Sequence, residues 1–187
     1  MALNWAMLSP ETRAPVPLPN EMTITSVDSG VEVTLNIPDA PPAGGSGGLR
    51  TLKAVGKASV TDMRFIFTSA TPNTTFESLS IPLPSILSSK FEQPTFGANY
   101  LSLGIKPSTD GGLTEGTTAE VRFKNTPMFS FAAVLDKTRE RAIYMKRQAA
   151  ENEEGLPVYT SPSEGSSVSS GGGSVTTPAD APPGYES

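Results

Sequence analysis

Four residues near the C-terminus have the types and spacing to do specific chemistry: Pro182, Pro183, Gly184 and Tyr185. Adjacent prolines fix φ near the polyproline II value, and each proline also keeps the residue before it extended. The segment therefore has little entropy to lose on binding, and it offers two pyrrolidine rings and a phenol to a groove lined with aromatic side chains. We predict that Pro182, Pro183 and Tyr185 bind WW domains, which recognise short proline ligands in this way.

A second, weaker motif lies upstream. Leu156, Pro157 and Tyr159 match a Leu-Pro-x-Tyr variant and are a second candidate for WW-domain binding. Residues 160–181, between the two motifs, are rich in serine and glycine and hold few apolar side chains, so burial cannot offset their ordering entropy. Residues 151–187 also carry six acidic and no basic side chains. We therefore predict that residues 152–187 are a disordered acidic tail that displays both motifs.

The composition limits what the rest of the chain can do. The 187 residues contain no cysteine and no histidine, which excludes disulfides, thiolate zinc sites and Ser-His-Asp catalysis. We expect no signal peptide and no membrane span, because no apolar run reaches the required length. We predict a protein that is not an enzyme and needs no cofactor or metal. Catalysis by paired carboxylates is the alternative, although the acidic residues occur singly.

Alternation between apolar and polar side chains predicts a β-rich domain upstream of the tail. In residues 31–37, four apolar positions alternate with three polar ones, which is typical of a strand with one buried face. Ser29-Gly30 is a turn signal, so residues 21–26 are predicted to pair with this strand as a hairpin. The other strands are predicted at residues 52–61, 63–69, 76–81, 90–93, 100–106 and 119–124, with a flexible loop at 38–49.

A helical pattern follows the last predicted strand. Thr126 suits the N-cap position and Pro127 the first helical position, where its missing N–H costs nothing. An apolar stripe recurs at spacings of three and four residues, as expected for a helix that packs on a sheet or plugs a barrel: Phe131, Leu135, Thr138, Ala142 and Met145. We therefore predict a mainly β (α+β) domain over residues 1–151, with about seven antiparallel strands in a barrel and one C-terminal helix.

The segment before residue 100 resembles a known family signature. Residues 91–100, Phe-Glu-Gln-Pro-Thr-Phe-Gly-Ala-Asn-Tyr, resemble the Gln-Pro-x-Phe-Gly-Ala-Asn-Tyr signature of GRAM domains in the WW-domain-binding protein 2 family. Residues 1–4, 31–36 and 63–67 resemble family segments in the same order, so that the resemblance covers roughly residues 1–150. Read as a structural corner, the signature is expected to bury Phe96 and to use Gly97 for a backbone conformation that other residues avoid.

The resemblance implies a pleckstrin-homology-like GRAM domain in an adaptor protein whose tail is recruited by WW domains of ubiquitin ligases and transcription coactivators. It also implies a transcription coactivator that is associated with chromatin, through its partners, and found in the nucleus and the cytoplasm. The chain departs from the animal pattern, in which long tails carry several Pro-Pro-x-Tyr motifs, because it has one full motif. A single motif gives less avidity than several.

A lipid-binding domain that acts at membranes is the alternative function. Four basic residues lie on or near the predicted strands 52–61 and 63–69: Arg50, Lys53, Lys57 and Arg64. They are candidates for contact with a phosphoinositide if they converge on one rim, and are ordinary outward strand residues if they do not. The helix adds a second basic set, which is either a solvated outer face or a patch for anionic lipid or nucleic acid: Lys137, Arg139, Arg141, Lys146 and Arg147.

Overall fold

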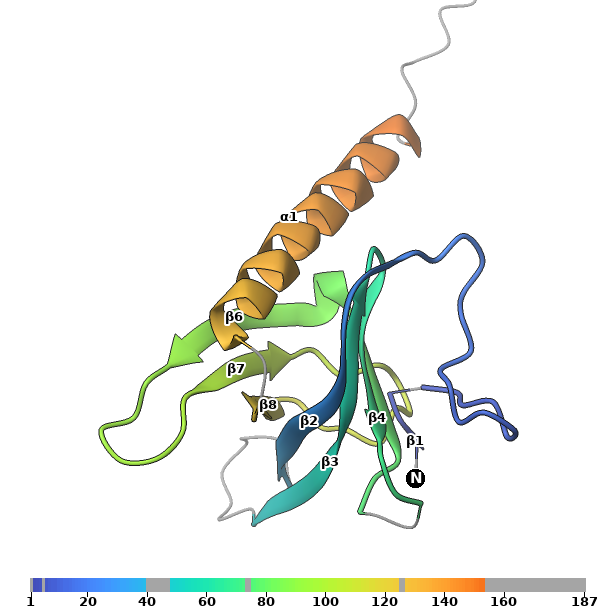
Figure 1. Ribbon diagram of the computed structural model, residues 1–187. Coiled ribbons are helices and arrows are strands. Elements are labelled where there is room, and N and C mark those ends of the chain that lie inside the picture. The colour runs from blue at the N-terminus through green and yellow to red at the C-terminus, as the bar shows by residue number, and fades with distance from the viewer. Residues whose placement is uncertain (1, 5, 40–47, 73–74, 125–126, 154–187) are drawn as a thin grey trace, which may run out of the picture. The chain divides into compact units, whose positions relative to one another are not determined.

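The computed structural model describes residues 2–4, 6–39, 48–72, 75–124 and 127–153. These residues lie in the first of two compact units, Met1–Glu154 and Gly155–Ser187. Within them, eight strands form one sheet in the order β1-β5-β4-β3-β2-β8-β7-β6 (Figure 1). The elements are β1 (Ala2–Leu3), β2 (Thr23–Pro38), β3 (Leu49–Thr61), β4 (Arg64–Ser69), β5 (Ser78–Pro82), the 3₁₀ turn η1 (Leu83–Ser85), β6 (Ile86–Glu92), β7 (Tyr100–Ile105), β8 (Thr118–Phe123) and α1 (Met128–Glu153). The predicted N-cap Thr126 and most of the predicted loop 38–49 lie outside the described residues.

Strand β2 joins the two halves of the sheet. It pairs antiparallel with β3 from end to end and with β8 over residues 31–36. Figure 1 shows the sheet curling at β2, with β3 and β4 on one side and β6, β7 and β8 on the other. The predicted alternation places Val31, Val33 and Leu35 between the two halves, where they are fully buried. The prediction of a mainly β fold that ends in one helix is confirmed.

The hairpin predicted around Ser29-Gly30 is wrong. Both halves of the segment belong to β2, because Val27 pairs with Ala58 and Val31 pairs with Gly56 on the same neighbouring strand. The residues between these two pairs are accommodated as a bulge in β2. Gly30 has φ +72°, in the left-handed region that favours glycine, and here this conformation bends the strand instead of reversing it.

Helix α1 packs over the core of the curled sheet. Phe131 and Leu135 are buried, and the Phe131 ring centroid lies 6.3 Å from that of Phe65 and 4.8 Å from that of Phe123. The predicted apolar stripe packs against the core as far as Ala142. The prediction fails at Met145, which is 55% exposed, because the second half of the helix runs past the sheet (Figure 1).

The residues before β2 form an arm that is part of the fold, and the structure describes it over residues 2–4 and 6–22. Strand β1 pairs in parallel with β5, a pairing too short to show as a pattern in the sequence. Asn4 is buried, and its Nδ2 donates to Ser80 O at 2.6 Å while its Oδ1 accepts from the N–H of Ser108 at 2.8 Å. Its own N–H donates to Gly111 O at 2.7 Å. Asn4 therefore ties the arm both to β5 and to the loop that follows β7.

Candidate functional site

The four basic residues predicted to contact an anionic lipid lie on β3 and β4 but have different surroundings. Arg50 is exposed near the start of β3. Lys53 forms an ion pair, with its Nζ 2.9 Å from Glu32 Oε1 on β2. Lys57 is half-buried farther along β3, and Arg64 on β4 is only 6% exposed. Arg50 and Lys57 are seven residues apart on an extended strand and Arg64 is buried, so the four side chains do not converge on one rim.

Arg64 has a structural role. Its Nε donates to Glu21 Oε1 at 2.7 Å and its Nη2 to Glu21 Oε2 at 2.8 Å, which makes a bidentate ion pair with the arm. Nη2 also donates to Val16 O at 2.7 Å, and Nη1 to Ser80 Oγ at 3.4 Å. Each nitrogen of the guanidinium thus has an acceptor within the fold. The assignment of Arg64 to lipid binding is corrected on this ground.

Glu21 is held ionised by the groups around it. Burial opposes its charge, but hydrogen bonds from Arg64, from the N–H of Leu18 at 2.7 Å and from Thr61 Oγ1 at 2.8 Å, with the positive charge of Arg64, outweigh burial. Together they hold the pKa of the Glu21 carboxyl below its usual range. The pair fastens the arm to the outer face of β3 and β4.

Two adjoining clefts lie between the arm and this outer face, and we call them together the trough. Each has a volume of about 310 Å³. Asp28, Lys57 and Thr68 line both clefts, which makes them continuous. The arm supplies one wall through five residues: Thr12, Arg13, Pro15, Pro17 and Glu21.

The bulge in β2 explains why the trough lies where it does. Lys57 is the β3 residue that stands opposite the bulge, between the partners of Val27 and Val31. The register of β2 and β3 shifts there, and outward side chains of the three strands form a floor rich in hydroxyl groups: Thr23, Ser26, Ser59, Thr61 and Thr68. The sequence gives no local signal for this site, since Gly30 indicates a turn and the arm shows no strand pattern.

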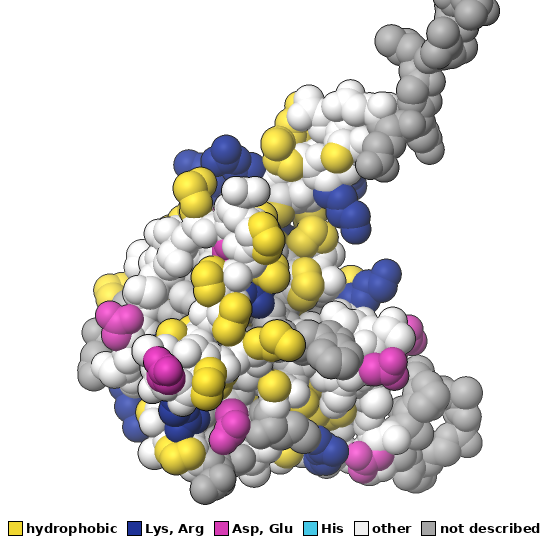
Figure 2. All heavy atoms as spheres, turned by 90° about the vertical axis from the view of Figure 1, so that its right-hand side faces the viewer, with side chains coloured by type: hydrophobic (Ala, Val, Ile, Leu, Met, Phe, Trp, Pro, Cys, Tyr) yellow, Lys and Arg dark blue, Asp and Glu magenta, His cyan; other side chains and the backbone are white. Residues whose placement is uncertain are grey.

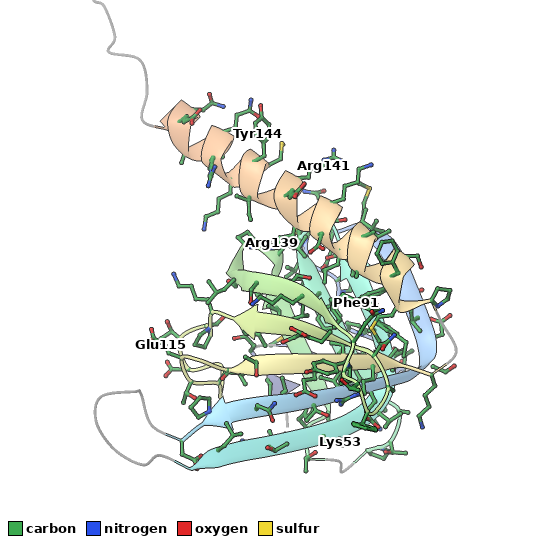
Figure 3. All side chains as sticks on the ribbon, turned by 90° about the vertical axis from the view of Figure 1, so that its left-hand side faces the viewer. Lys53, Phe91, Glu115, Arg139, Arg141 and Tyr144 are labelled. Atoms are coloured by element: carbon green, nitrogen blue, oxygen red, sulfur yellow. The ribbon has the colours of Figure 1, made fainter. Side chains whose placement is uncertain are left out.

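The family-like segment at residues 91–100 leaves the sheet between β6 and β7. Phe96 is 92% exposed in this loop, so the prediction that it is buried is wrong. The loop extends beyond the strands, and no other described element covers the ring. Gly97 has φ +114°, which confirms the prediction of a backbone conformation that side chains disfavour. Phe91, at the start of the segment, packs against Phe129 of α1 with ring centroids 6.5 Å apart (Figure 3).

The basic residues of α1 divide into two groups. Arg139 is held by the sheet, since its Nε donates to Ile86 O at 2.7 Å and its Nη2 to Leu87 O at 3.2 Å. Figure 3 shows Arg139 on the sheet side of α1 and Arg141 on the opposite side, with Lys53 far from both on β3. The remaining basic residues are exposed: Lys137, Arg141, Lys146 and Arg147.

Both predicted WW-binding motifs lie outside the described residues. They are Pro182, Pro183 and Tyr185 in the first motif and Leu156, Pro157 and Tyr159 in the second. Within the described ranges, the helix is too short of apolar residues to cross a membrane. The same ranges contain no group of three or more acidic side chains placed to hold a metal ion.

Comparison with known proteins gives the fold but no family. No protein-family model matches the sequence. A UPF0664 stress-induced protein of Schizosaccharomyces pombe is 23% identical over 143 residues, which cover 75% of this chain and 78% of that protein. Among solved structures, the Vps36 N-terminal PH domain matches with a TM-score of 0.51 at 14% identity, covering 77% of this chain and 95% of that domain. The chain therefore has a pleckstrin-homology-like fold, mainly β with a C-terminal helix.

Proposed function

We propose that the protein is a non-enzymatic adaptor that combines a pleckstrin-homology-like domain with a WW-binding motif. The observation that carries this proposal is the sequence Pro182-Pro183-Gly184-Tyr185. Adjacent prolines favour the extended polyproline II conformation, and a tyrosine offers both buried area and a hydroxyl to a binding groove. The resemblance of residues 91–100 to GRAM domains of the WW-domain-binding protein 2 family supports the same role.

The partners that fit this proposal are WW-domain proteins, namely ubiquitin ligases and transcription coactivators. An adaptor of this kind works in the nucleus and the cytoplasm, and it reaches chromatin through its partners. The full motif provides most of the affinity. The motif at Leu156, Pro157 and Tyr159 lacks the first proline of the pair and therefore binds more weakly.

The test is a titration of the ¹⁵N-labelled full chain with an isolated WW domain. We expect shifts at residues 181–187 at micromolar affinity, and their loss in Tyr185→Ala, because the groove then loses the phenol. Tyr159→Ala is the matched control, since it removes a tyrosine from the weaker motif and should change the affinity little. Full binding by Tyr185→Ala would refute the proposal.

Contact with an anionic membrane surface is a second candidate function, and the protruding half of α1 favours it. Tyr144 and Met145 are 63% and 55% exposed there, beside the exposed cations Lys146 and Arg147. Figure 2 shows Lys and Arg side chains on either side of the protruding helix. Exposed apolar groups flanked by cations suit the interface of an acidic bilayer.

Co-sedimentation with vesicles of phosphatidylcholine and phosphatidylserine tests this second function. Binding should be lost in the double variant Lys146→Gln/Arg147→Gln and kept in Lys90→Gln, which removes an exposed lysine from β6. Equal binding by both variants would exclude α1 as the contact.

A further inference from the structure

We propose that the trough between the arm and the outer face of β2, β3 and β4 binds a phosphate monoester. The group would be carried either by a small soluble molecule or by a lipid headgroup. The proposal rests on two cations in the trough that have no carboxylate partner among the described residues, on hydroxyl groups beside them, and on a volume that fits a small ligand. It goes beyond the adaptor function, which uses the tail.

Lys57 provides the first cation. It stands opposite the bulge in β2 and lines both clefts. The side chain is half-buried, and no carboxylate among the described residues lies within ion-pair distance of it. This contrasts with Lys53, four residues earlier on the same strand, which pairs with Glu32. A half-buried ammonium without a counter-charge favours binding of an anion.

Arg13 provides the second cation. The arm makes a tight turn at this point, since the N–H of Arg13 donates to Ser9 O at 2.9 Å and the N–H of Ser9 donates to Ala14 O at 2.8 Å. Arg13 has φ +52°, a strained backbone for a residue with a side chain, and it lines the cleft that also contains Lys57. Its Nη2 is buried without an acceptor. That nitrogen has no contact with solvent as placed, so a rotation of the side chain lets an oxyanion in the cleft supply the acceptor that it lacks.

The acidic residues that line the trough determine whether its net charge is positive or negative. Glu21 lines the first cleft, but its negative charge is balanced by Arg64. Asp28 lines both clefts and is exposed, which places its carboxylate at the rim. Two cations therefore face one uncommitted carboxylate, and the hydroxyl of Thr68 lies on the floor between the clefts.

The side chains that line the trough and its volume both suit a phosphate monoester. A phosphate monoester accepts several hydrogen bonds at once, which suits the guanidinium fork of arginine, a point-charge ammonium and a hydroxyl. A cleft of about 310 Å³ is at the lower end of the range for ligand sites. It holds a phosphate with the small group that carries it. Of the basic residues predicted to contact lipid, Lys57 and Arg64 line the trough, and Arg64 is paired with Glu21, which leaves Lys57 to bind the anion.

Titration of the ¹⁵N-labelled full chain tests the proposal with three probes: inorganic phosphate, soluble inositol 1-phosphate, and phosphatidylcholine vesicles that contain phosphatidylinositol 4-phosphate. We expect shifts in the bulge at residues 28–30 and in Lys57 and Thr68. Lys57→Gln and Arg13→Gln should each weaken binding on the order of tenfold, and Asp28→Asn should strengthen it by roughly threefold, because removal of a like charge favours the anion. Lys90→Gln on β6 is the control and should have no effect.

Removal of a positive charge and removal of a negative charge should change the affinity in opposite directions, and this difference tests the proposal. Shifts that survive unchanged in Lys57→Gln, or an Asp28→Asn variant that binds no better than wild type, would overturn the proposal. If the soluble probes bind and vesicles add nothing, the ligand is a small phosphorylated molecule. If vesicles bind tightly and Lys57→Gln abolishes that binding, the ligand is a lipid headgroup. The unfolding midpoint of each variant, measured by circular dichroism, must match wild type for its titration to count.

Discussion

At the scale of single residues, the ion pair between Glu21 and Arg64 makes stability depend on pH. The folded-state pKa of Glu21 is lower than its pKa in the unfolded chain, which is about 4.3. The ionised carboxyl therefore stabilises the fold above that pH, and its contribution is lost as the pH falls through the folded-state pKa. We expect the difference in unfolding free energy between wild type and Glu21→Gln to be largest near neutral pH and to shrink below about pH 4.

Urea denaturation at several pH values measures this difference. Glu120→Gln is the control, because Glu120 makes a more exposed ion pair with Arg122, at 2.8 Å, and such pairs contribute about 1 kcal/mol or less. A difference for Glu21→Gln that is the same in acid and at neutral pH would show that the carboxyl is not ionised in the folded protein.

Two phenylalanines differ in how much they stabilise the fold, because one is buried and the other is exposed. Phe67 is fully buried and packs against Phe76 with ring centroids 5.4 Å apart. Phe67→Ala should cost about 3–5 kcal/mol in unfolding free energy, whereas Phe96→Ala should cost about 0.5 kcal/mol or less because the ring is exposed. Denaturation of the two variants measures both values. A large loss for Phe96→Ala would show that another part of the chain covers the ring.

At the scale of elements, the bulge in β2 depends on Gly30. An alanine there would have to adopt φ +72°, and we expect Gly30→Ala to lose about 1–2 kcal/mol of unfolding free energy. Ser29→Ala, one residue away, is the matched control and should have little effect. If Gly30→Ala is as stable as wild type, the bulge can form in another conformation, and the position of Lys57 would no longer depend on it.

The elements also show how far sequence reasoning reaches. The alternation in residues 31–37 and the three-four spacing from Phe131 to Ala142 predict the correct elements, because each pattern has a single buried face. The direction of the chain at Gly30 could not be predicted, since a positive φ serves a turn and a bulge equally well. Strand β6 begins at Ile86, earlier than predicted, because the tight turn η1 ends there and pairing with Ile105 starts at once.

The candidate site was predictable only in part, for a physical reason. Lys57 and Arg64 look alike in the sequence as basic residues of neighbouring strands. What distinguishes them is the arm, which brings Glu21 to one and leaves the other without a counter-charge. Contacts between segments this far apart leave no periodic trace in the sequence. The tail motif needs no such contacts, and so the sequence alone predicts it.

At the scale of the whole molecule, the arm closes the domain through Asn4. Asn4→Ala would leave Ser80 O and the N–H of Ser108 without their partner and would place an alanine at φ +54°. We expect a loss of about 3 kcal/mol in unfolding free energy. Asn4→Gly loses the hydrogen bonds but tolerates the backbone, so it should lose about 1 kcal/mol less. Equal losses in the two variants, measured by denaturation, would mean that the backbone at Asn4 is not strained.

The position of β2 between β3 and β8 has a consequence for synthesis on the ribosome. The partner β3 follows β2 closely and can pair as soon as it emerges, but β8 leaves the exit tunnel after most of the domain has been made. Until then the β8-facing edge of β2 stays open beside an alternating apolar face. An open strand edge is a site for chaperones and for unwanted pairing between nascent chains. Completion of the sheet must wait for this distant strand, so its arrival sets the earliest point at which the domain can fold.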